Sequence, residues 1–139
     1  MNIHIINGPN LNLLGKREID IYGNKSFDNY LLELKESFPG INLTYFQSNV
    51  EGELINEIQR IGFTVDGIVF NPAAYSHTSI AIGDAVAAIT SPLIEVHISN
   101  IYSREEFRKH SYVSAKAVGV ITGLGLNGYK LAIDWFLNK

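Results

Sequence analysis

The stretch "SPLIEVHISN", residues 91–100, places two ionisable side chains in what is otherwise a buried strand pattern. Its apolar, largely β-branched run over residues 93–98 predicts a parallel strand that is covered on both faces. Glu95 and His97 interrupt this run, and they point to the same face because strand side chains alternate. Burying an unpaired carboxylate costs several kcal/mol. Glu95 therefore needs a partner, and His97 is the nearest candidate.

Other apolar runs resemble this one and predict a sheet with five strands in all. The additional runs are residues 3–6, 41–46, 65–70 and 117–121. Between and after them lie helical patterns: residues 27–38 behind a Ser26 cap, 54–61, 80–89, and a last helix that carries Leu131, Ile133, Trp135 and Phe136. A short charged helix is expected over Arg104–Lys109.

Strands that alternate with helices indicate βαβ units and a parallel sheet. Right-handed crossovers between five strands favour a flavodoxin-like α/β sandwich of three layers, with the strand order 2-1-3-4-5. No repeat or linker interrupts the pattern, so residues 1–139 are expected to form a single flavodoxin-like domain.

Composition excludes several classes of protein. The 139 residues contain no cysteine, which rules out a disulfide framework and zinc–thiolate sites. The net charge of −3 does not favour general nucleic-acid binding. There is no basic, apolar leader at the N-terminus and no apolar run of roughly 18 residues. We therefore expect a cytoplasmic protein with no membrane or nucleic-acid partner.

Polar loops follow the strands that the predicted order makes neighbours. The first strand leads into "NGPNLNLLGKREIDIYG" (7–23), the third into "NPAAYSHTS" (71–79), and the fourth ends at His97. Ligands in such sheets bind beyond the carboxyl ends of the strands, where the winding reverses. These segments are therefore expected to converge on one crevice, and the long first loop is typical of a lid or binding loop.

Each polar residue also has a structural interpretation. Asn71 could be a capping residue, and His77 could be the polar start of the next helix. Arg104 and Arg108 are four apart, which places them on one face of a helix, where they could pair with Glu105 and other surface acids.

Three other motifs suggest cofactors, and the sequence argues against each. His77, Glu95 and His97 form a known type of metal-ligand set, but no tight ligand spacing supports a metal site. "GLGLNG" (123–128) matches a dinucleotide-binding pattern, yet too little chain follows for the acidic residue that binds the ribose. "GPNLNLLGK" does not have the spacing of a phosphate-binding P-loop.

Several segments together resemble a known family, the type II 3-dehydroquinate dehydratases. The segments are "NGPNLNLLGKRE…YG", "QSNVEGELI", "NPAAYSHTS", "IEVHISNIYSREEFRKHSY" and "GVITGLGLNGY". The resemblance covers nearly the whole chain and keeps the family's order. It implies an enzyme of the shikimate or quinate pathway that eliminates water in the anti sense from 3-dehydroquinate, through an enolate, to give 3-dehydroshikimate. It also implies that no cofactor and no metal takes part.

The resemblance implies roles for five residues in the chemistry. Tyr22 would be the base that removes the proton next to the ketone, with Arg17 as the nearby cation. Asn10 would hold the water that stabilises the enolate oxygen. His97 would be the acid that protonates the departing hydroxyl, and Glu95 would orient it. Such a β-hydroxy ketone needs a base, an acid and an enolate stabiliser to lose water.

The resemblance also implies residues that bind the substrate. Asn71 would assist His97, and Ile98 and Ser99 would offer donors to the substrate carboxylate. His77 and Arg108 would hold ring hydroxyls.

Two further residues and the assembly follow from the same resemblance. Arg104 would help to position the Tyr22 lid, and Asp84 would reach the site of a neighbouring subunit in a homo-oligomer, a dodecamer of trimers. Ile19 stands where the family often has proline after the Arg-Glu pair, which bears on the stiffness of the lid.

The rival interpretations on this fold are a flavodoxin and a receiver domain. A receiver needs an acidic pocket and an aspartate after the third strand, whereas Asn7 and Asn71 occupy those positions. A flavodoxin needs a phosphate loop rich in Ser, Thr and Gly, which "NGPNLNLLG" is not. An enzymatically silent paralogue of the same fold stays open, as does the choice between biosynthetic and catabolic service.

Overall fold

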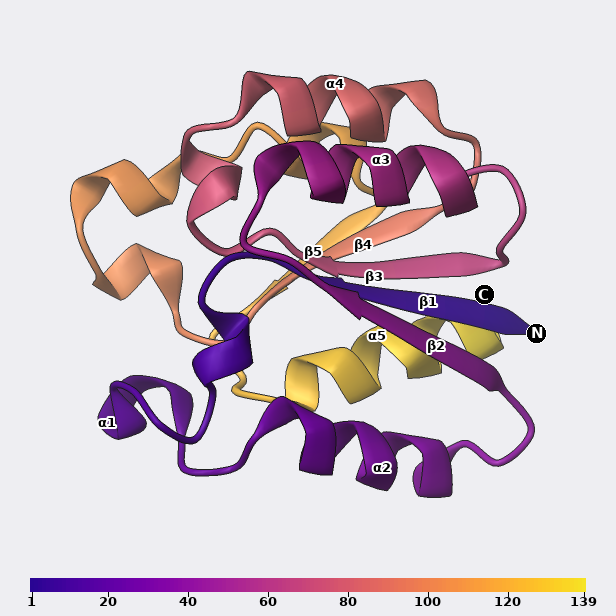
Figure 1. The fold of residues 1–139 in the computed structure, drawn as a ribbon, viewed down its shortest axis with the longest axis horizontal. Helices are drawn as coiled ribbons and strands as arrows, with labels where there is room; N and C mark the ends of the chain where they lie inside the picture. Colours follow the sequence, from indigo (N-terminus) through magenta and orange to yellow (C-terminus); the bar gives the residue numbers. More distant parts are fainter.

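The protein, described over residues 1–139 by a computed structural model, is built on one parallel sheet. The strands are β1 (Asn2–Asn7), β2 (Asn42–Gln47), β3 (Gly67–Asn71), β4 (Leu93–His97) and β5 (Gly119–Thr122). They lie in the order β2-β1-β3-β4-β5, and every neighbouring pair is parallel (Figure 1). The predicted flavodoxin-like α/β class and strand order are confirmed.

Helices cover both faces of the sheet and make the fold three layers thick. The longer helices are α2 (Phe27–Ser37), α3 (Glu51–Ile61), α4 (Ile80–Ala88) and α5 (Asn127–Asn138). Helices α3 and α4 pack on one face, and α2 and α5 pack on the other (Figure 1). Each face has its own buried core: Ile94 and Val96 belong to the α2/α5 core, whereas Leu93 belongs to the α3/α4 core.

Serine caps fix where two of these helices begin. Ser26 Oγ accepts the Asn29 N–H at 3.2 Å, which confirms the predicted cap of α2. Ser79 Oγ accepts the Ile82 N–H at 3.0 Å and so caps α4. His77 therefore does not start that helix, and instead ends a short 3-10 helix over Ala73–His77.

Several predicted boundaries are wrong by one to three residues because local turns compete with the regular elements. Val65 belongs to the turn that ends α3, since its N–H bonds to the Ile61 carbonyl, and β3 begins only at Gly67. Ala117 bonds back to Val113, so β5 begins at Gly119. The remaining shifts are in β1, β2, α2, α3, α4 and the end of β4.

The loops at the carboxyl ends of the strands hold more structure than the sequence predicted. The first loop contains the 3-10 turn Leu11–Leu13 and the short helix α1 (Ile19–Tyr22), where only a loop was expected. The predicted helix Arg104–Lys109 is instead a 3-10 turn over Glu106–Lys109, flanked by the turns Ile101–Ser103 and Ser114–Lys116. Arg104 is in extended backbone, so it does not share a helical face with Arg108.

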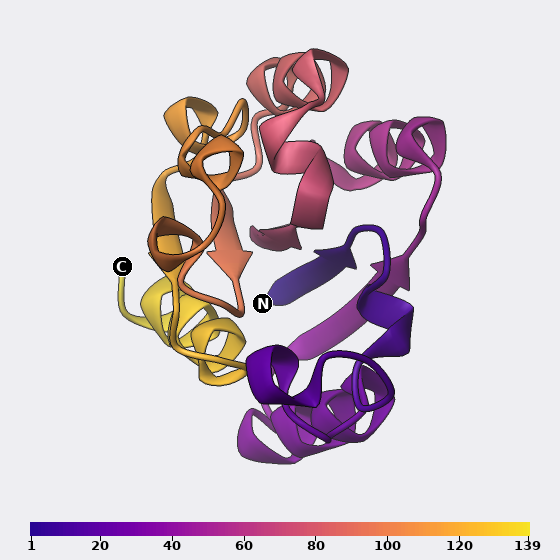
Figure 2. The same cartoon turned by 90° about the vertical axis from the view of Figure 1, so that its left-hand side faces the viewer.

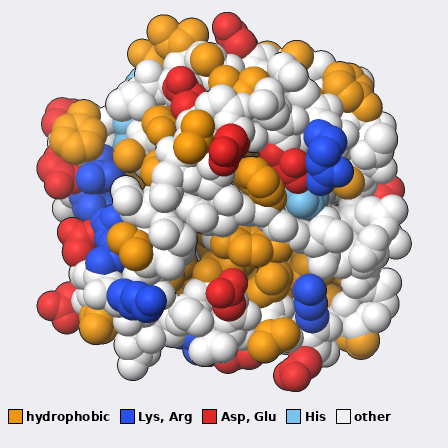
Figure 3. All heavy atoms as spheres, in the orientation of Figure 1, with side chains coloured by type: hydrophobic (Ala, Val, Ile, Leu, Met, Phe, Trp, Pro, Cys, Tyr) orange, Lys and Arg blue, Asp and Glu red, His pale blue; other side chains and the backbone are white.

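These loops gather at one end of the molecule. Figure 2 looks onto the carboxyl ends of the strands, with the first loop, the Ala73–His77 turn and the 101–116 segment arranged around them. Lys and Arg side chains, with acidic neighbours, cluster over this end at the left of Figure 3. No helix of the fold has the length and apolar character needed to cross a membrane.

Candidate active site

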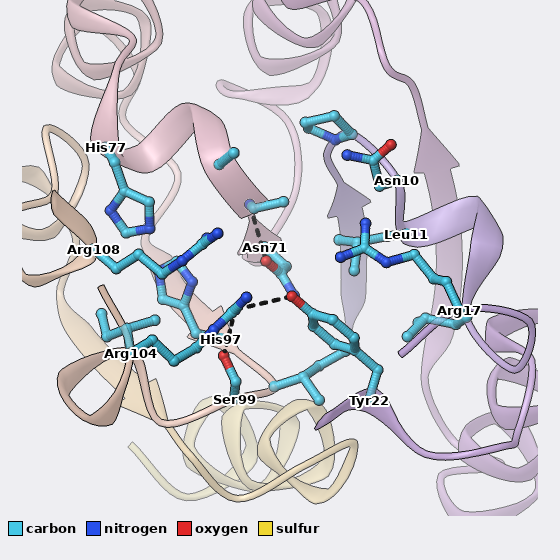
Figure 4. Close-up of a pocket in the computed structure, with 16 residues that line it drawn as sticks. Asn10, Leu11, Arg17, Tyr22, Asn71, His77, His97, Ser99, Arg104 and Arg108 are labelled. Carbon is cyan, nitrogen blue, oxygen red and sulfur yellow. Dashed lines mark hydrogen bonds between the residues drawn. The ribbon is translucent and has the colours of Figure 1, made fainter. Parts of the chain in front are cut away.

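A pocket opens at the carboxyl ends of β1, β3 and β4, where the sequence predicted a crevice (Figure 4). Its empty volume is about 620 Å³, counting the open mouth. It is lined by ten of the twelve residues that the sequence singled out: Asn10, Arg17, Tyr22, Asn71, His77, His97, Ile98, Ser99, Arg104 and Arg108. Segments far apart in the chain therefore converge as the topology required.

The other two predicted residues lie outside the pocket lining. Glu95 is fully buried behind His97. Asp84 is exposed on α4 and is not part of the pocket of its own chain.

The two polar side chains that interrupt β4 are hydrogen-bonded to each other. His97 Nε2 lies 2.6 Å from Glu95 Oε2, with 0% of Glu95 and 4% of His97 exposed. The predicted partner of Glu95 is therefore confirmed. Because Nε2–H donates to the carboxylate, Nδ1 is the ring nitrogen left for the pocket.

Burial raises the pKa of the Glu95 carboxyl, but its hydrogen bonds outweigh this effect. The donors are His97, Ser111 and Ser114, and the charge of His97 adds to them, so the pKa lies below its ordinary value. Glu95 is thus held ionised inside the protein. Ser111 and Ser114 were not predicted from the sequence. The only indication of them there is a pair of hydroxyl residues, three apart, in the loop before β5.

Two arginines contact Tyr22, one at its hydroxyl and one at its ring. Arg104 Nη1 donates to the Tyr22 hydroxyl at 2.9 Å and to Ser99 Oγ at 3.1 Å (Figure 4). The Arg17 guanidinium lies 4.9 Å from the centre of the Tyr22 ring and also pairs with Glu18. In this structure the cation bound to the hydroxyl is therefore Arg104, and Arg17 contacts the ring.

Asn71 supports the turn after β3 and also lines the pocket, although Pro72 is the N-cap of the 3-10 helix that follows. Its Oδ1 accepts the Ala73 N–H at 3.0 Å, which supports Ala73 at a φ of 52°. Its Nδ2 donates to the Tyr129 hydroxyl at 2.9 Å, and that hydroxyl donates to Asn7 Oδ1 at 2.8 Å. Burial raises the pKa of Tyr129, which keeps the phenol neutral. The orientation of the Asn71 amide in the pocket is therefore fixed.

His77 is fixed as a neutral hydrogen-bond acceptor. Its Nδ1 lies 2.7 Å from the His110 carbonyl oxygen, to which only an N–H can donate. Burial lowers the pKa of His77, with contributions from the charges of His97 and Arg108, so the ring is neutral near pH 7. Its ring stacks against that of His97 with centroids 5.9 Å apart. Nε2 of His77 can therefore accept a hydrogen bond from a ligand hydroxyl.

Arginine dominates the charge of the pocket. Arg17, Arg104 and Arg108 line it, and no carboxylate does. Arg108 Nε also contacts Glu105 at 2.5 Å, which confirms the predicted surface pairing of a residue that also lines the pocket. Three guanidinium groups without a carboxylate in the lining favour an anionic ligand.

Asn10 enters the pocket from an uncommon backbone conformation. Its φ is 68°, and its N–H donates to Asn49 Oδ1 at 2.9 Å. Figure 4 shows its side chain beside those of Arg17 and Leu11. The apolar part of the lining, which the sequence analysis did not identify, includes Leu11, Leu14 and Ile101.

The arrangement provides groups for acid–base chemistry on a small anion. The pocket holds a cation-bound phenol, an imidazole backed by an ionised carboxylate, and polar groups that can orient a ligand. No group of three or more His, Cys, Asp or Glu side chains is arranged to hold a metal ion.

Comparisons with known proteins give one family. A family model described as "Dehydroquinase class II" matches residues 1–137. The 3-dehydroquinate dehydratase of Aliarcobacter butzleri (strain RM4018) is 53% identical over 135 residues, covering 96% of this chain and 82% of that protein. The one from Clostridium botulinum (strain Kyoto / Type A2) is 52% identical over 140 residues, covering 99% and 95%.

Solved structures agree with these relatives. A type II dehydroquinase from Propionibacterium acnes superposes with a TM-score of 0.93 at 44% identity, covering 99% of this chain and 97% of that chain. A type II dehydroquinase from Butyrivibrio crossotus DSM 2876 gives a TM-score of 0.92 at 48% identity, and again covers 99% of this chain and 97% of that chain.

Proposed function

This chain belongs to the class II dehydroquinases, enzymes that dehydrate 3-dehydroquinate in the shikimate pathway, and we propose that Tyr22 and His97 carry out the two proton transfers of that reaction. The activity itself, conversion of 3-dehydroquinate to 3-dehydroshikimate and water, follows from membership of the family. The residue roles below are our assignment.

The observation that carries the assignment is that one pocket holds a phenol bound to a cation and an imidazole bound to a carboxylate. The Tyr22 hydroxyl is bound to the Arg104 cation, which stabilises a phenolate. The His97 imidazole is backed by the ionised Glu95, which stabilises an imidazolium. A phenolate can accept a proton and an imidazolium can donate one, as an elimination of water requires.

In the first step, the Tyr22 phenolate removes a proton from the carbon next to the ketone. The electrons of that C–H bond move onto the ketone oxygen, which becomes an enolate. A water held by Asn10 stabilises this oxygen, and the arginines balance the negative charge of the complex. Arg17, over the ring of Tyr22, adds to the positive potential at the base.

In the second step, the enolate re-forms the ketone and expels the hydroxyl in the anti sense. His97 Nδ1 gives its proton to that hydroxyl as the C–O bond breaks, so water leaves. Asn71 assists at this position because its amide is held by Tyr129. The carbon–carbon double bond of the product is conjugated with the ketone.

The remaining pocket residues hold the substrate. The Ile98 backbone and the Ser99 hydroxyl donate to the substrate carboxylate, as the arginine-rich lining favours. His77, fixed as an acceptor, and Arg108, a donor, hold ring hydroxyls.

We also propose the wider setting. Residues 1–139 form one catalytic domain that works in the cytoplasm without a cofactor. Twelve chains assemble as trimers within a dodecamer, and Asp84, which is exposed on α4, reaches the pocket of a neighbouring chain.

The test is an absorbance assay with purified protein and 3-dehydroquinate. The conjugated enone of the product absorbs in the ultraviolet, so turnover appears as rising absorbance. The wild-type chain should produce this signal, and His97→Ala should lose nearly all of it while still binding substrate. A His97→Ala protein that kept most of its turnover would remove His97 from the role of acid.

A further inference from the structure

The Glu95 carboxylate is enclosed by two serines from the segment before β5. Ser111 Oγ donates to Glu95 Oε1 at 2.9 Å and to Oε2 at 3.1 Å, and Ser114 Oγ donates to Oε1 at 2.9 Å. His97 Nε2 donates to Oε2 at 2.6 Å. Three donors therefore contact the two oxygens, with the single Ser111 proton shared between them, and the carboxylate is held from both sides inside the protein.

The two serines are themselves held in different ways. Ser111 Oγ also accepts the N–H groups of Val113 and Ser114, at 3.1 and 3.2 Å, and so is part of its own turn. Ser114 Oγ has its hydrogen bond to Glu95 alone. Removal of the Ser114 hydroxyl thus changes the carboxylate with little effect on the turn, whereas removal of the Ser111 hydroxyl changes both.

We propose that Ser111 and Ser114 are positioning residues for the acid step, which hold Glu95 in the one orientation that makes His97 present Nδ1 and its proton to the substrate. Neither serine lines the pocket, so both act through Glu95. This inference rests on the proposed function, in which His97 protonates the departing hydroxyl.

The hydrogen bonds from the serines also affect how strongly Glu95 attracts the proton of His97. A carboxylate that accepts O–H donors is less basic than one without them, so it attracts the imidazolium proton less strongly. The only titratable side chain that contacts Glu95 is His97. The imidazole of His97 faces Glu95 and the neutral His77, next to which Arg108 lies. Removal of a serine donor therefore strengthens the attraction between the Glu95 carboxylate and the imidazolium.

The test compares Ser114→Ala with Ser114→Thr and with a matched control. In Ser114→Ala, kcat should fall about tenfold, the scale of one lost hydrogen bond to a charged group. KM should stay unchanged, and the alkaline limb of the pH profile of kcat should move to higher pH. Ser114→Thr keeps a hydroxyl and should restore both kcat and the pH limb.

The control is Ser91→Ala. Ser91 is also buried, and its hydroxyl donates to the Val65 carbonyl at 2.8 Å, beyond the amino end of β4. This variant should lose similar stability but keep the wild-type kcat and pH profile. Thermal unfolding of each variant separates a loss of fold from a loss of positioning.

The outcomes distinguish a failure of the role proposed for His97 from a failure of the role proposed for the two serines. If His97→Ala retains turnover, the proposed function fails first, and the serine inference fails with it. If His97→Ala is inactive but Ser114→Ala keeps the wild-type kcat and pH limb, only the serine inference is overturned. Equal losses in the Ala and Thr variants, or a rise in KM alone, would also overturn it.

Discussion

At the scale of single residues, the decisive feature is a carboxylate that has no contact with water. Glu95 is fully buried, yet its pKa is lowered because His97 and two serines donate to it. The same contacts that orient the imidazole also hold the charge in place. Stability and chemistry therefore depend on the same four side chains.

This arrangement predicts a specific acid sensitivity. Because the folded-state pKa of Glu95 lies below the ordinary 4.5, the ionised group adds stability that is present above pH 4.5 and is lost as the pH falls through its folded value. Glu95→Gln cannot titrate. Its free energy of unfolding, measured with urea, should be lower than that of the wild type at pH 7 and should fall less steeply below pH 4.5. Parallel pH curves for the two proteins would contradict the prediction.

At the scale of elements, Tyr129 connects the ends of the strands that form the pocket. Its hydroxyl, on α5, bridges Asn7 at the end of β1 and Asn71 at the end of β3. Neighbouring chain segments do not predict this contact, because 122 and 58 residues separate the partners. The Asn71 side chain is therefore positioned by a helix at the far end of the sequence.

Tyr129→Phe should lower both stability and turnover. The change leaves a buried amide oxygen of Asn7 without its donor, which costs about 1–3 kcal/mol. It also releases the Asn71 amide, so kcat should fall severalfold. Urea unfolding and initial rates would measure the two effects.

Tyr30→Phe provides the matched comparison. The Tyr30 hydroxyl of the wild type donates to the Leu126 carbonyl at 2.6 Å, outside the pocket. The Tyr30→Phe variant should therefore lose stability without losing kcat. Equal kcat values for the Tyr129 and Tyr30 variants would contradict the role given to Tyr129.

The helices and strands also show which parts of the structure can be predicted from the sequence. Apolar strand runs that alternate with helical patterns predicted the strand order and a crevice at the carboxyl ends of the strands, because those patterns are local and the topology follows general rules. The resemblance to the dehydroquinases supplied the site residues, ten of which line this pocket. The four-residue helix α1 and the 3-10 turns were not predicted, because such short segments depend on tertiary contacts. Arg104 shows this well: its hydrogen bond to Tyr22 spans 82 residues.

At the scale of the whole molecule, one proposal lies outside a single chain. Asp84 is exposed and has no contact with its own pocket, so any role in substrate binding requires a second copy. The dodecamer that we propose should give, by light scattering, a mass about twelve times the 15.4 kDa of the chain. A monomer at micromolar concentration would contradict the assembly and, with it, the role of Asp84.

The role of Tyr22 as the base is tested by the turnover of Tyr22→Phe under saturating 3-dehydroquinate. An ordinary tyrosine has a pKa of about 10, so few molecules carry the phenolate at pH 7 without a cation nearby. The structure supplies that cation as Arg104, at 2.9 Å from the hydroxyl. Tyr22→Phe should lose nearly all kcat, because the proton acceptor is gone. The substrate dissociation constant, measured by calorimetry, should change by only a small factor, because the ring remains. A Tyr22→Phe enzyme that keeps most of its kcat would contradict the account.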